Sequence, residues 1–183
     1  MRRVSVVGNT GSGKTRLARR IAERLRVPCL ELDSIHHQAD WQPLDPDTFR
    51  ARVREHTAGD GWVVDGNYSA VQDLVWSRAD TVIWLDLSRP VVMWQVVGRT
   101  LRRAVTREEL WNGNREPLRN FLTLEPEDSV IAWAWTRHRV YRERYELAMS
   151  NPSWAHLRFV RVRSRHDVKR LFGGPGCPEC EVK

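Results

Sequence analysis

The chain has 183 residues, a length that suits one domain with a sizeable hydrophobic core. Its formal net charge of +7 at pH 7 indicates an anionic partner, and 27 of its 30 basic residues are arginine. Its three cysteines exclude a disulfide framework, and the sequence has neither a secretory signal pattern nor an apolar run of membrane-spanning length. We therefore expect a cytoplasmic protein without a membrane partner.

Two interpretations of the arginine excess stay open. A genome that favours arginine codons would scatter these residues over the surface, whereas a phosphate-binding site would use several of them as clamps. A nucleic-acid surface would require a clustered basic stripe. The arginines are instead spread along the whole chain.

The first fifteen residues carry the most specific motif in the sequence. Residues 1–7 are typical of a short apolar strand, and residues 16–26 have the apolar spacing of an amphipathic helix. The octet between them is Gly8, Asn9, Thr10, Gly11, Ser12, Gly13, Lys14 and Thr15. It fits G-x-x-x-x-G-K-[ST], the phosphate-binding loop (P-loop) of nucleotidases, in the strand-to-helix context that this motif requires.

The chemistry of phosphate binding explains the composition of this octet. Its glycines allow a tight turn whose backbone N–H groups approach phosphate oxygens, and the following helix presents the positive end of its dipole. Lys14 is expected to contact the β- and γ-phosphates, and the Thr15 hydroxyl is expected to bind Mg²⁺. The octet therefore predicts ATP and Mg²⁺ as cofactors, with Lys14 as a catalytic residue.

Apolar patterns after the octet alternate between strand and helix. They predict strands over residues 28–33, 62–65, 80–87 and 157–162, and helices over residues 45–56, 69–77, 88–103, 126–149 and 165–172. This alternation predicts an α/β fold of the P-loop NTPase type, with three α/β/α layers around a five-stranded parallel sheet.

The domain is expected to span residues 1–172. Within it, residues 106–125 are rich in charge, glycine, asparagine and proline, and we interpret them as a small mobile lid. Residues 173–183 are predicted to be a flexible tail. Cys177 and Cys180 in this tail form a lone C-x-x-C pair, which is a weak signal for zinc.

Two carboxylates, Asp33 and Asp65, end predicted strands. Because the carboxyl ends of parallel strands meet at one edge of a sheet, we expect both beside the octet. One would act as the general base that activates an acceptor hydroxyl, and the other would assist Mg²⁺. We assign Asp33 as the base and Asp65 to the metal, and the reverse assignment stays open.

Polar and aromatic residues next to these carboxylates complete a predicted acceptor site. We interpret His36 and His37 as substrate contacts rather than metal ligands, because adjacent histidines rarely bind one ion; the polarity of an ordinary loop is the alternative. Asn67 and Tyr68, after the third strand, are assigned to the same site. Four aromatic residues would either line this site or pack in the core: Trp41, Trp62, Tyr68 and Trp76.

These motifs resemble those of the P-loop kinases related to adenylate kinase. The resemblance covers roughly residues 1–172 and is carried by the octet, by Val64-Asp65-Gly66 and by Arg99-x-x-x-Arg103 before a lid. Three stretches are similar to a subgroup usually labelled topology modulation (FlaR-like) proteins. They are Leu32-Asp33-x-x-His36-His37, Trp62-Val63-Val64-Asp65-Gly66-Asn67-Tyr68 and Trp111-Asn112-Gly113-Asn114-Arg115-Glu116.

The resemblance implies roles for several polar side chains. Arg99 would lie on the adenine face, and Arg103, one turn later on the same helix face, would clamp the transferring phosphate. Arg115 corresponds in place to a lid arginine that closes on ATP. Arg137 resembles a helix arginine that faces the acceptor or the phosphates, and Ser164 lies in the turn that would cradle adenine.

Two departures from adenylate kinases bear on the acceptor. Those enzymes have Thr-Gly-Asp after the second strand, where this chain has residues 33–37, and Phe-Pro-Arg after the third, where it has Asn67-Tyr68-Ser69. Since the missing arginine grips a monophosphate acceptor, a neutral or hydroxyl-bearing acceptor fits better. We hypothesise an ATP-dependent phosphotransferase of the nucleotide- and small-molecule-kinase type. The alternative is a nucleic-acid-associated ATPase of the topology modulation type.

Overall fold

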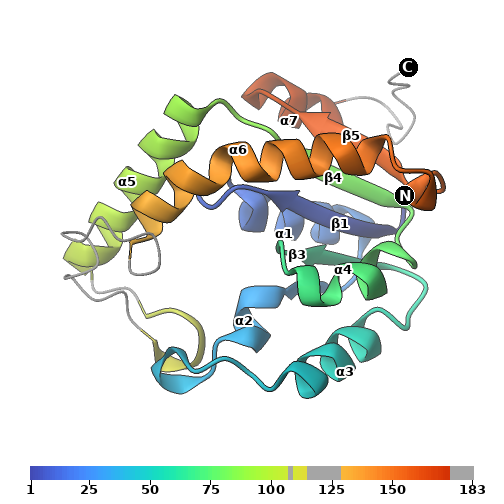
Figure 1. The fold of residues 1–183 in the computed structure, drawn as a ribbon, viewed down its shortest axis with the longest axis horizontal. Coiled ribbons are helices and arrows are strands. Elements are labelled where there is room, and N and C mark those ends of the chain that lie inside the picture. The colour runs from blue at the N-terminus through green and yellow to red at the C-terminus, as the bar shows by residue number, and fades with distance from the viewer. Residues whose placement is uncertain (107–108, 115–128, 174–183) are drawn as a thin grey trace.

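A computed structural model describes residues 1–106, 109–114 and 129–173 of the chain. Its strands form one parallel sheet in the order β2-β3-β1-β4-β5, with helices on both faces (Figure 1). The strands are β1 (Arg3–Gly8), β2 (Cys29–Glu31), β3 (Trp62–Asp65), β4 (Thr81–Leu85) and β5 (Arg158–Val162). The predicted α/β fold with a five-stranded parallel sheet is confirmed.

In the described residues, seven α-helices and three short 3-10 turns lie between the strands or after the last of them. The helices are α1 (Lys14–Leu25), α2 (Leu32–His36), α3 (Pro46–His56), α4 (Ser69–Trp76), α5 (Arg89–Thr106), α6 (Val130–Met149) and α7 (Arg165–Phe172). The 3-10 turns are η1 (Ala39–Trp41), η2 (Trp111–Gly113) and η4 (Pro152–Trp154). The start of α3 follows from its sequence, because the Asp45 carboxylate accepts a hydrogen bond from the Thr48 N–H and Pro46 occupies the first turn.

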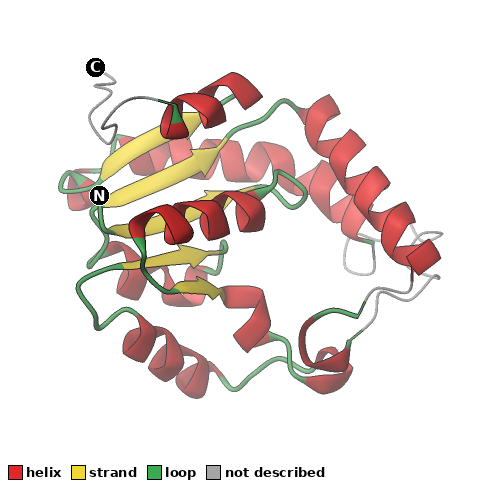
Figure 2. Ribbon diagram, turned by 180° about the vertical axis from the view of Figure 1, so that it is seen from behind, coloured by secondary structure: helices red, strands yellow, loops and turns green. Residues whose placement is uncertain are grey.

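Strand β1 lies in the middle of the sheet, between β3 and β4. Its alternate residues face opposite helix layers, so that Val4 and Val6 pack with α1 and α7, and Val7 packs with α3, α4 and α6. Figures 1 and 2 show these two layers from opposite sides of the sheet. Because β1 is buried on both faces, the P-loop that follows it starts from a rigid position.

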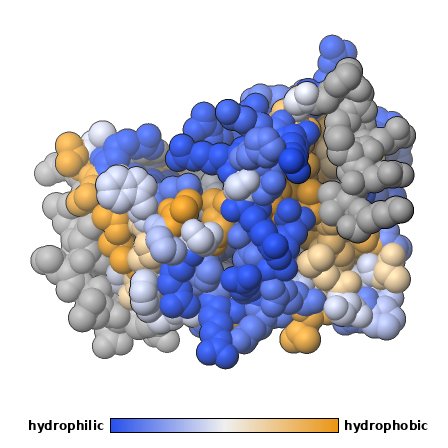
Figure 3. Space-filling model, turned by 90° about the horizontal axis from the view of Figure 1, so that it is seen from above, coloured by the Kyte–Doolittle hydropathy of each residue, from blue (hydrophilic) through white to orange (hydrophobic). Residues whose placement is uncertain are grey.

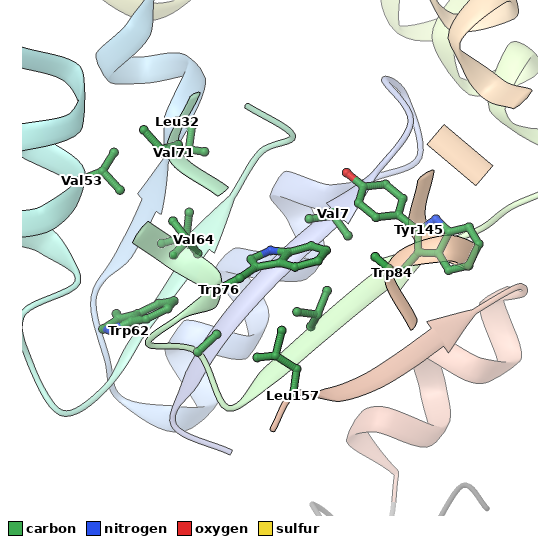
Figure 4. Packing of buried hydrophobic residues seen from close by; sticks show 14 of the residues in the cluster. Val7, Leu32, Val53, Trp62, Val64, Val71, Trp76, Trp84, Tyr145 and Leu157 are labelled. Atoms are coloured by element: carbon green, nitrogen blue, oxygen red, sulfur yellow. The ribbon is translucent and has the colours of Figure 1, made fainter. Parts of the chain in front are cut away.

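Aromatic rings fill the layer under α3, α4 and α6 (Figure 4). The ring of Tyr145 lies 6.3 Å from the ring of Trp76 and 5.6 Å from that of Trp84, measured between ring centres. Trp62 is 0% exposed and Trp76 is 2% exposed. Trp62 and Trp76 therefore pack in the core and do not line the acceptor site.

Strand β2 is shorter than the sequence pattern predicts. It ends at Glu31, and Asp33 lies in the first turn of α2 instead of at the end of a strand. The Leu32 side chain is buried against Gly66, where a Cβ atom would come within 2.9 Å of it, and the Ser34 hydroxyl donates a hydrogen bond to the Glu31 carbonyl. These contacts turn the backbone into a helix immediately after Glu31.

The predicted lid is described only in part. Thr106 ends α5, and residues 109–114 form a turn around η2. Residues 107–108 and 115–128 lie outside the described residues, as do Arg115 and the tail with Cys177 and Cys180. In the part of the chain that the structure describes, no helix is both long and apolar enough to cross a membrane.

Hydrophilic side chains cover the middle of the face seen in Figure 3. On α6, Arg139 and Arg142 pair with Glu143 and Glu146 one turn later, at 2.6 and 3.5 Å. Exposed pairs with this spacing are typical of a solvated helix face and offset part of its positive charge. They do not favour a nucleic-acid surface on this helix.

Candidate active site

The P-loop has the backbone conformation that its glycines allow. The φ angles of Gly8, Gly11 and Gly13 are 145°, 75° and 89°, in the region that favours glycine. At Gly11 a second constraint comes from packing, because a Cβ atom there would lie 2.1 Å from the Val96 Cγ2 atom of α5. The loop leads directly into α1 at Lys14, so the amino end of this helix faces the position expected for phosphates.

Two asparagine side chains hold the P-loop in place, one from within the loop and one from the segment after β3. The Asn9 amide donates to the Ala134 carbonyl of α6 at 2.7 Å, and its oxygen accepts from the Thr10 N–H at 2.8 Å. The Asn67 side chain bonds both the N–H and the carbonyl of Gly8. The sequence assigns Asn67 to acceptor binding, but the structure directs its side chain towards the P-loop, where the Tyr145 hydroxyl also donates to it at 2.9 Å.

Lys14, Thr15 and Asp65 come together at the carboxyl end of β1 and β3. The Thr15 hydroxyl donates to the Asp65 carboxylate at 2.6 Å, and the Lys14 ammonium donates to the Asn9 carbonyl at 3.1 Å. Burial lowers the pKa of Lys14, and the negative charges of Asp65 and Asp33 oppose this shift. Lys14, Asp65 and Asp33 therefore interact electrostatically with one another, and Thr15 joins this group through its hydrogen bond to Asp65.

The chemistry of this group fits a magnesium ion. Asp65 is 5% exposed, and its Oδ1 atom is buried without a hydrogen-bond partner among the described residues. The oxygens of Asp65 and Thr15 are the type of ligand that Mg²⁺ prefers. Within residues 1–106, 109–114 and 129–173, no cluster of three His, Cys, Asp or Glu could hold a metal ion. A bound Mg²⁺ would therefore depend on nucleotide phosphates and water for its other ligands.

We expect Asp65 to make the nucleotide-free protein less stable as the pH rises from about 4 to about 6. Burial raises the pKa of Asp65 from 3.8 to about 6, so the folded state binds this proton more tightly than the unfolded chain does. Its contribution to the free energy of unfolding therefore falls across this window and is lost above it. In chemical denaturation, Asp65 should lower the free energy of unfolding of the parent protein by about 1–3 kcal/mol across this window. Asp65→Asn should not show this decrease.

Asp40→Asn is the matched control for this measurement, because Asp40 is exposed. Its stability should follow the parent protein across the same pH window. A pH profile of Asp65→Asn that runs parallel to the parent profile would contradict the assignment.

The acceptor side of the site is built around Asp33 and Tyr68. The Tyr68 hydroxyl donates to Asp33 Oδ1 at 2.7 Å and lies 3.3 Å from His37 Nε2. The His36 ring packs 4.6 Å from the Tyr68 ring and 5.1 Å from the Phe49 ring. Burial and the neighbouring His37 lower the pKa of His36. The structure therefore brings together four of the predicted acceptor residues.

The turn around η2 contacts residues 33–41, which we call the acceptor loop. The Asn114 side chain donates to the Gln38 carbonyl at 2.8 Å and accepts from the Trp41 N–H at 3.0 Å. The Asn112 side chain donates to the His37 carbonyl at 2.5 Å. Residues 109–114 of the predicted lid are thus attached to the acceptor loop.

The predicted nucleotide-binding arginines lie on α5. Arg99 is close enough to Lys14 for its charge to lower the Lys14 pKa. Arg103 follows one helical turn later, and both arginines are half-buried. By contrast, Arg137 on α6 is exposed, and its guanidinium lies over the Trp133 ring at 4.4 Å from the ring centre.

Ser164 forms the N-terminal cap of α7. Its hydroxyl accepts from the Asp167 N–H at 3.1 Å, and its own N–H donates to the Asp167 carboxylate at 2.8 Å. The N–H of Arg163 donates to the same carboxylate at 2.9 Å. The polar groups that were expected near adenine are therefore engaged in a capping box.

Sequence reasoning missed Glu31 as a member of the site. Its side chain is 13% exposed and accepts from Arg19 at 2.6 Å and from the Trp111 indole N–H at 3.3 Å. A signal was present, because Glu31 precedes Asp33 by two residues and both are acidic. The contact with Trp111 spans 80 residues of sequence and has no local signal.

No protein-family model matches the sequence, and no curated protein matches it either. Among solved structures, the chain is similar to shikimate kinase from Bacteroides thetaiotaomicron, with 14% identity, coverage of 92% of this chain and 94% of that chain, and a TM-score of 0.50. A gluconokinase from Sinorhizobium meliloti 1021 has 19% identity, coverage of 92% and 91%, and a TM-score of 0.47. An uncharacterized protein from Eubacterium ventriosum ATCC 27560 has 13% identity, coverage of 57% and 69%, and a TM-score of 0.40. At 14% identity, the likeness to the shikimate kinase shows a shared α/β fold alone.

Proposed function

We propose that the protein is an ATP-dependent phosphotransferase that transfers the γ-phosphate of ATP to a hydroxyl group of a small acceptor. The observation that carries this proposal is the position of Lys14, whose charge interacts with both Asp65 and Asp33. A half-buried lysine in a P-loop, with one carboxylate bonded to the P-loop threonine and another at the acceptor loop, would provide both halves of a kinase site.

Asp33 is the proposed general base. Its carboxylate accepts the proton of the acceptor hydroxyl while the acceptor oxygen bonds to the γ-phosphorus. The bond between the γ-phosphorus and the bridging oxygen breaks, and ADP leaves with the electron pair. Tyr68 holds Asp33 Oδ1 by its hydrogen bond, which leaves Oδ2 for the acceptor.

Lys14 and the arginines of α5 are proposed to offset charge on the transferred phosphoryl group. Lys14 would contact the β- and γ-phosphates, Arg103 the transferring phosphate and Arg99 the adenine face. Thr15 and Asp65 would hold Mg²⁺, which supplies positive charge to the phosphate oxygens when bound. A closer relationship to the topology modulation (FlaR-like) subgroup is part of the same proposal and rests on the motifs around Asp33, Asp65 and Trp111.

A panel of acceptors tests this function. The protein would be incubated with ATP and Mg²⁺ and with nucleosides, nucleoside monophosphates, sugars or hydroxylated acids, and ADP release would be measured. We expect slow ADP release alone and a large increase with one class of acceptor. If no acceptor increases the rate and DNA does so in a salt-sensitive manner, the nucleic-acid-associated ATPase is favoured instead.

A further inference from the structure

We propose that the η2 turn forms a wall of the acceptor site, and that Trp111 is a specificity-determining residue that selects an uncharged acceptor with a flat ring. This inference rests on the proposed phosphotransferase function and names the substrate class of the same site. It follows from the attachment of the turn, the rings that surround Asp33, and the charge at this edge of the sheet.

The attachment of the turn is extensive for so short a segment. Trp111, Asn112 and Asn114 all use their side chains to bond the acceptor loop or the end of β2. Asn114 is 4% exposed and also bonds the Trp111 carbonyl, which fixes the internal shape of the turn. Asn112 and Gly113 have φ angles of 56° and 79°, which these residue types adopt readily. Trp111 is therefore held in a defined position against the acceptor loop.

Trp111 is linked to the proposed base through two intervening rings, those of His37 and Tyr68. The His37 ring stacks with the Trp111 ring at 6.3 Å and an interplanar angle of 27°. The same His37 ring has its Nε2 atom 3.3 Å from the Tyr68 hydroxyl, which bonds Asp33. Trp41 contacts His37 from another direction, with 5.3 Å between ring centres. An acceptor hydroxyl at Asp33 would thus place the body of the acceptor beside aromatic faces.

Aromatic faces favour a planar acceptor. A flat ring gains stacking energy on indole, phenol and imidazole faces irrespective of its hydrogen-bonding pattern. The negative charge at this edge adds a second criterion. Asp33 and Asp65 interact electrostatically with each other, whereas Glu31 is paired with Arg19 at 2.6 Å and accepts the indole N–H of Trp111. This field repels an acceptor that carries its own phosphate or carboxylate.

Ribonucleosides are suitable probes, because they combine hydroxyl groups with an uncharged flat ring. Binding of four ribonucleosides, their 5′-monophosphates and a hexose would be measured by calorimetry in the presence of a non-hydrolysable ATP analogue and Mg²⁺. ADP release with ATP would be measured for the same panel. We expect at least one nucleoside to bind more tightly than its monophosphate and than the hexose.

Three substitutions of Trp111 separate stacking from bulk. Trp111→Ala and Trp111→Leu should both raise the Kd and KM for the nucleoside about tenfold or more, because leucine restores bulk but not an aromatic face. Trp111→Phe should stay within about threefold of the parent protein. The KM for ATP should not change in any of them. Trp94→Ala is the matched control, since Trp94 on α5 is 82% exposed, and it should leave every constant unchanged.

The outcomes distinguish this inference from the proposed function. Transfer to a monophosphate or a hexose in preference to nucleosides would overturn the inference and leave the kinase in place. Equal effects of Trp111→Leu and Trp111→Phe would also overturn it, because the role would then be structural. Nucleoside binding that depends on Trp111 without any phosphoryl transfer would support the inference and contradict the proposed function. Thermal melting of each variant identifies any that fail to fold, and the leucine and phenylalanine variants retain most of the side-chain volume at this position.

Discussion

Lys14→Ala is expected to lower kcat for phosphoryl transfer by about a thousandfold. Lys14 is the half-buried cation of the P-loop; it donates to the Asn9 carbonyl and interacts electrostatically with Asp65 and Asp33. Removal of one preorganised positive group from a water-excluded site costs roughly 10²–10³ in rate, and a charged group stands at the upper end. Steady-state ADP release with saturating acceptor and Mg²⁺ measures the effect.

The control for this variant is Lys169→Ala, because Lys169 is exposed on α7. Its kcat should equal that of the parent protein. Thermal melting should show that Lys14→Ala remains folded, since the alanine removes a desolvated charge as well as its contacts. Undiminished turnover in a folded Lys14→Ala protein would contradict both the kinase and the ATPase hypotheses.

Asp33→Asn is expected to lower kcat with acceptor by a factor of roughly 10²–10⁴, the usual contribution of a general base. Asparagine retains an oxygen that can accept the hydrogen bond of the Tyr68 hydroxyl, so the acceptor loop should keep its shape. It cannot accept the proton of the acceptor hydroxyl. The affinity for ATP, measured by calorimetry, should therefore remain within about twofold while transfer is lost.

Asp40→Asn serves as the matched control, because Asp40 lies in η1 of the same loop and is exposed. It should transfer phosphate at the parental rate. If Asp33→Asn is active and Asp65→Asn has lost the chemical step with normal Mg²⁺ dependence, the roles of the two carboxylates are reversed.

The phosphate half of the site could be predicted from the sequence because its geometry is local. The octet fixes the backbone through its glycines, and the parallel pairing of β1 with β3 places Val6 opposite Asp65. The meeting of Thr15 with Asp65 follows from these two facts. The five-stranded sheet was equally accessible, because the strands and helices alternate with clear apolar patterns.

The acceptor half could not be predicted in the same detail because long-range contacts define it. Asp33 lies in a helix owing to the packing of Leu32 against Gly66, which no pattern near Asp33 reveals. The Asn67 side chain turns towards Gly8, although the next residue, Tyr68, bonds Asp33. The η2 turn bonds a loop more than 70 residues earlier in the chain, so neither its partner nor its side of the site has a local signal.

The position of β2 has a consequence for how such a protein can change. β2 is a three-residue strand at the edge of the sheet and pairs with β3 alone, whereas β1 has neighbours on both sides. The segment with α2 and η1 follows β2 directly and therefore lies at this edge of the sheet. Apart from Leu32, which packs in the core with Val7 and Val64, exchanges there would leave the central strands and the P-loop undisturbed. Under the proposed function, exchanges in this segment would change which alcohol is recognised and leave the residues proposed to bind ATP unaltered.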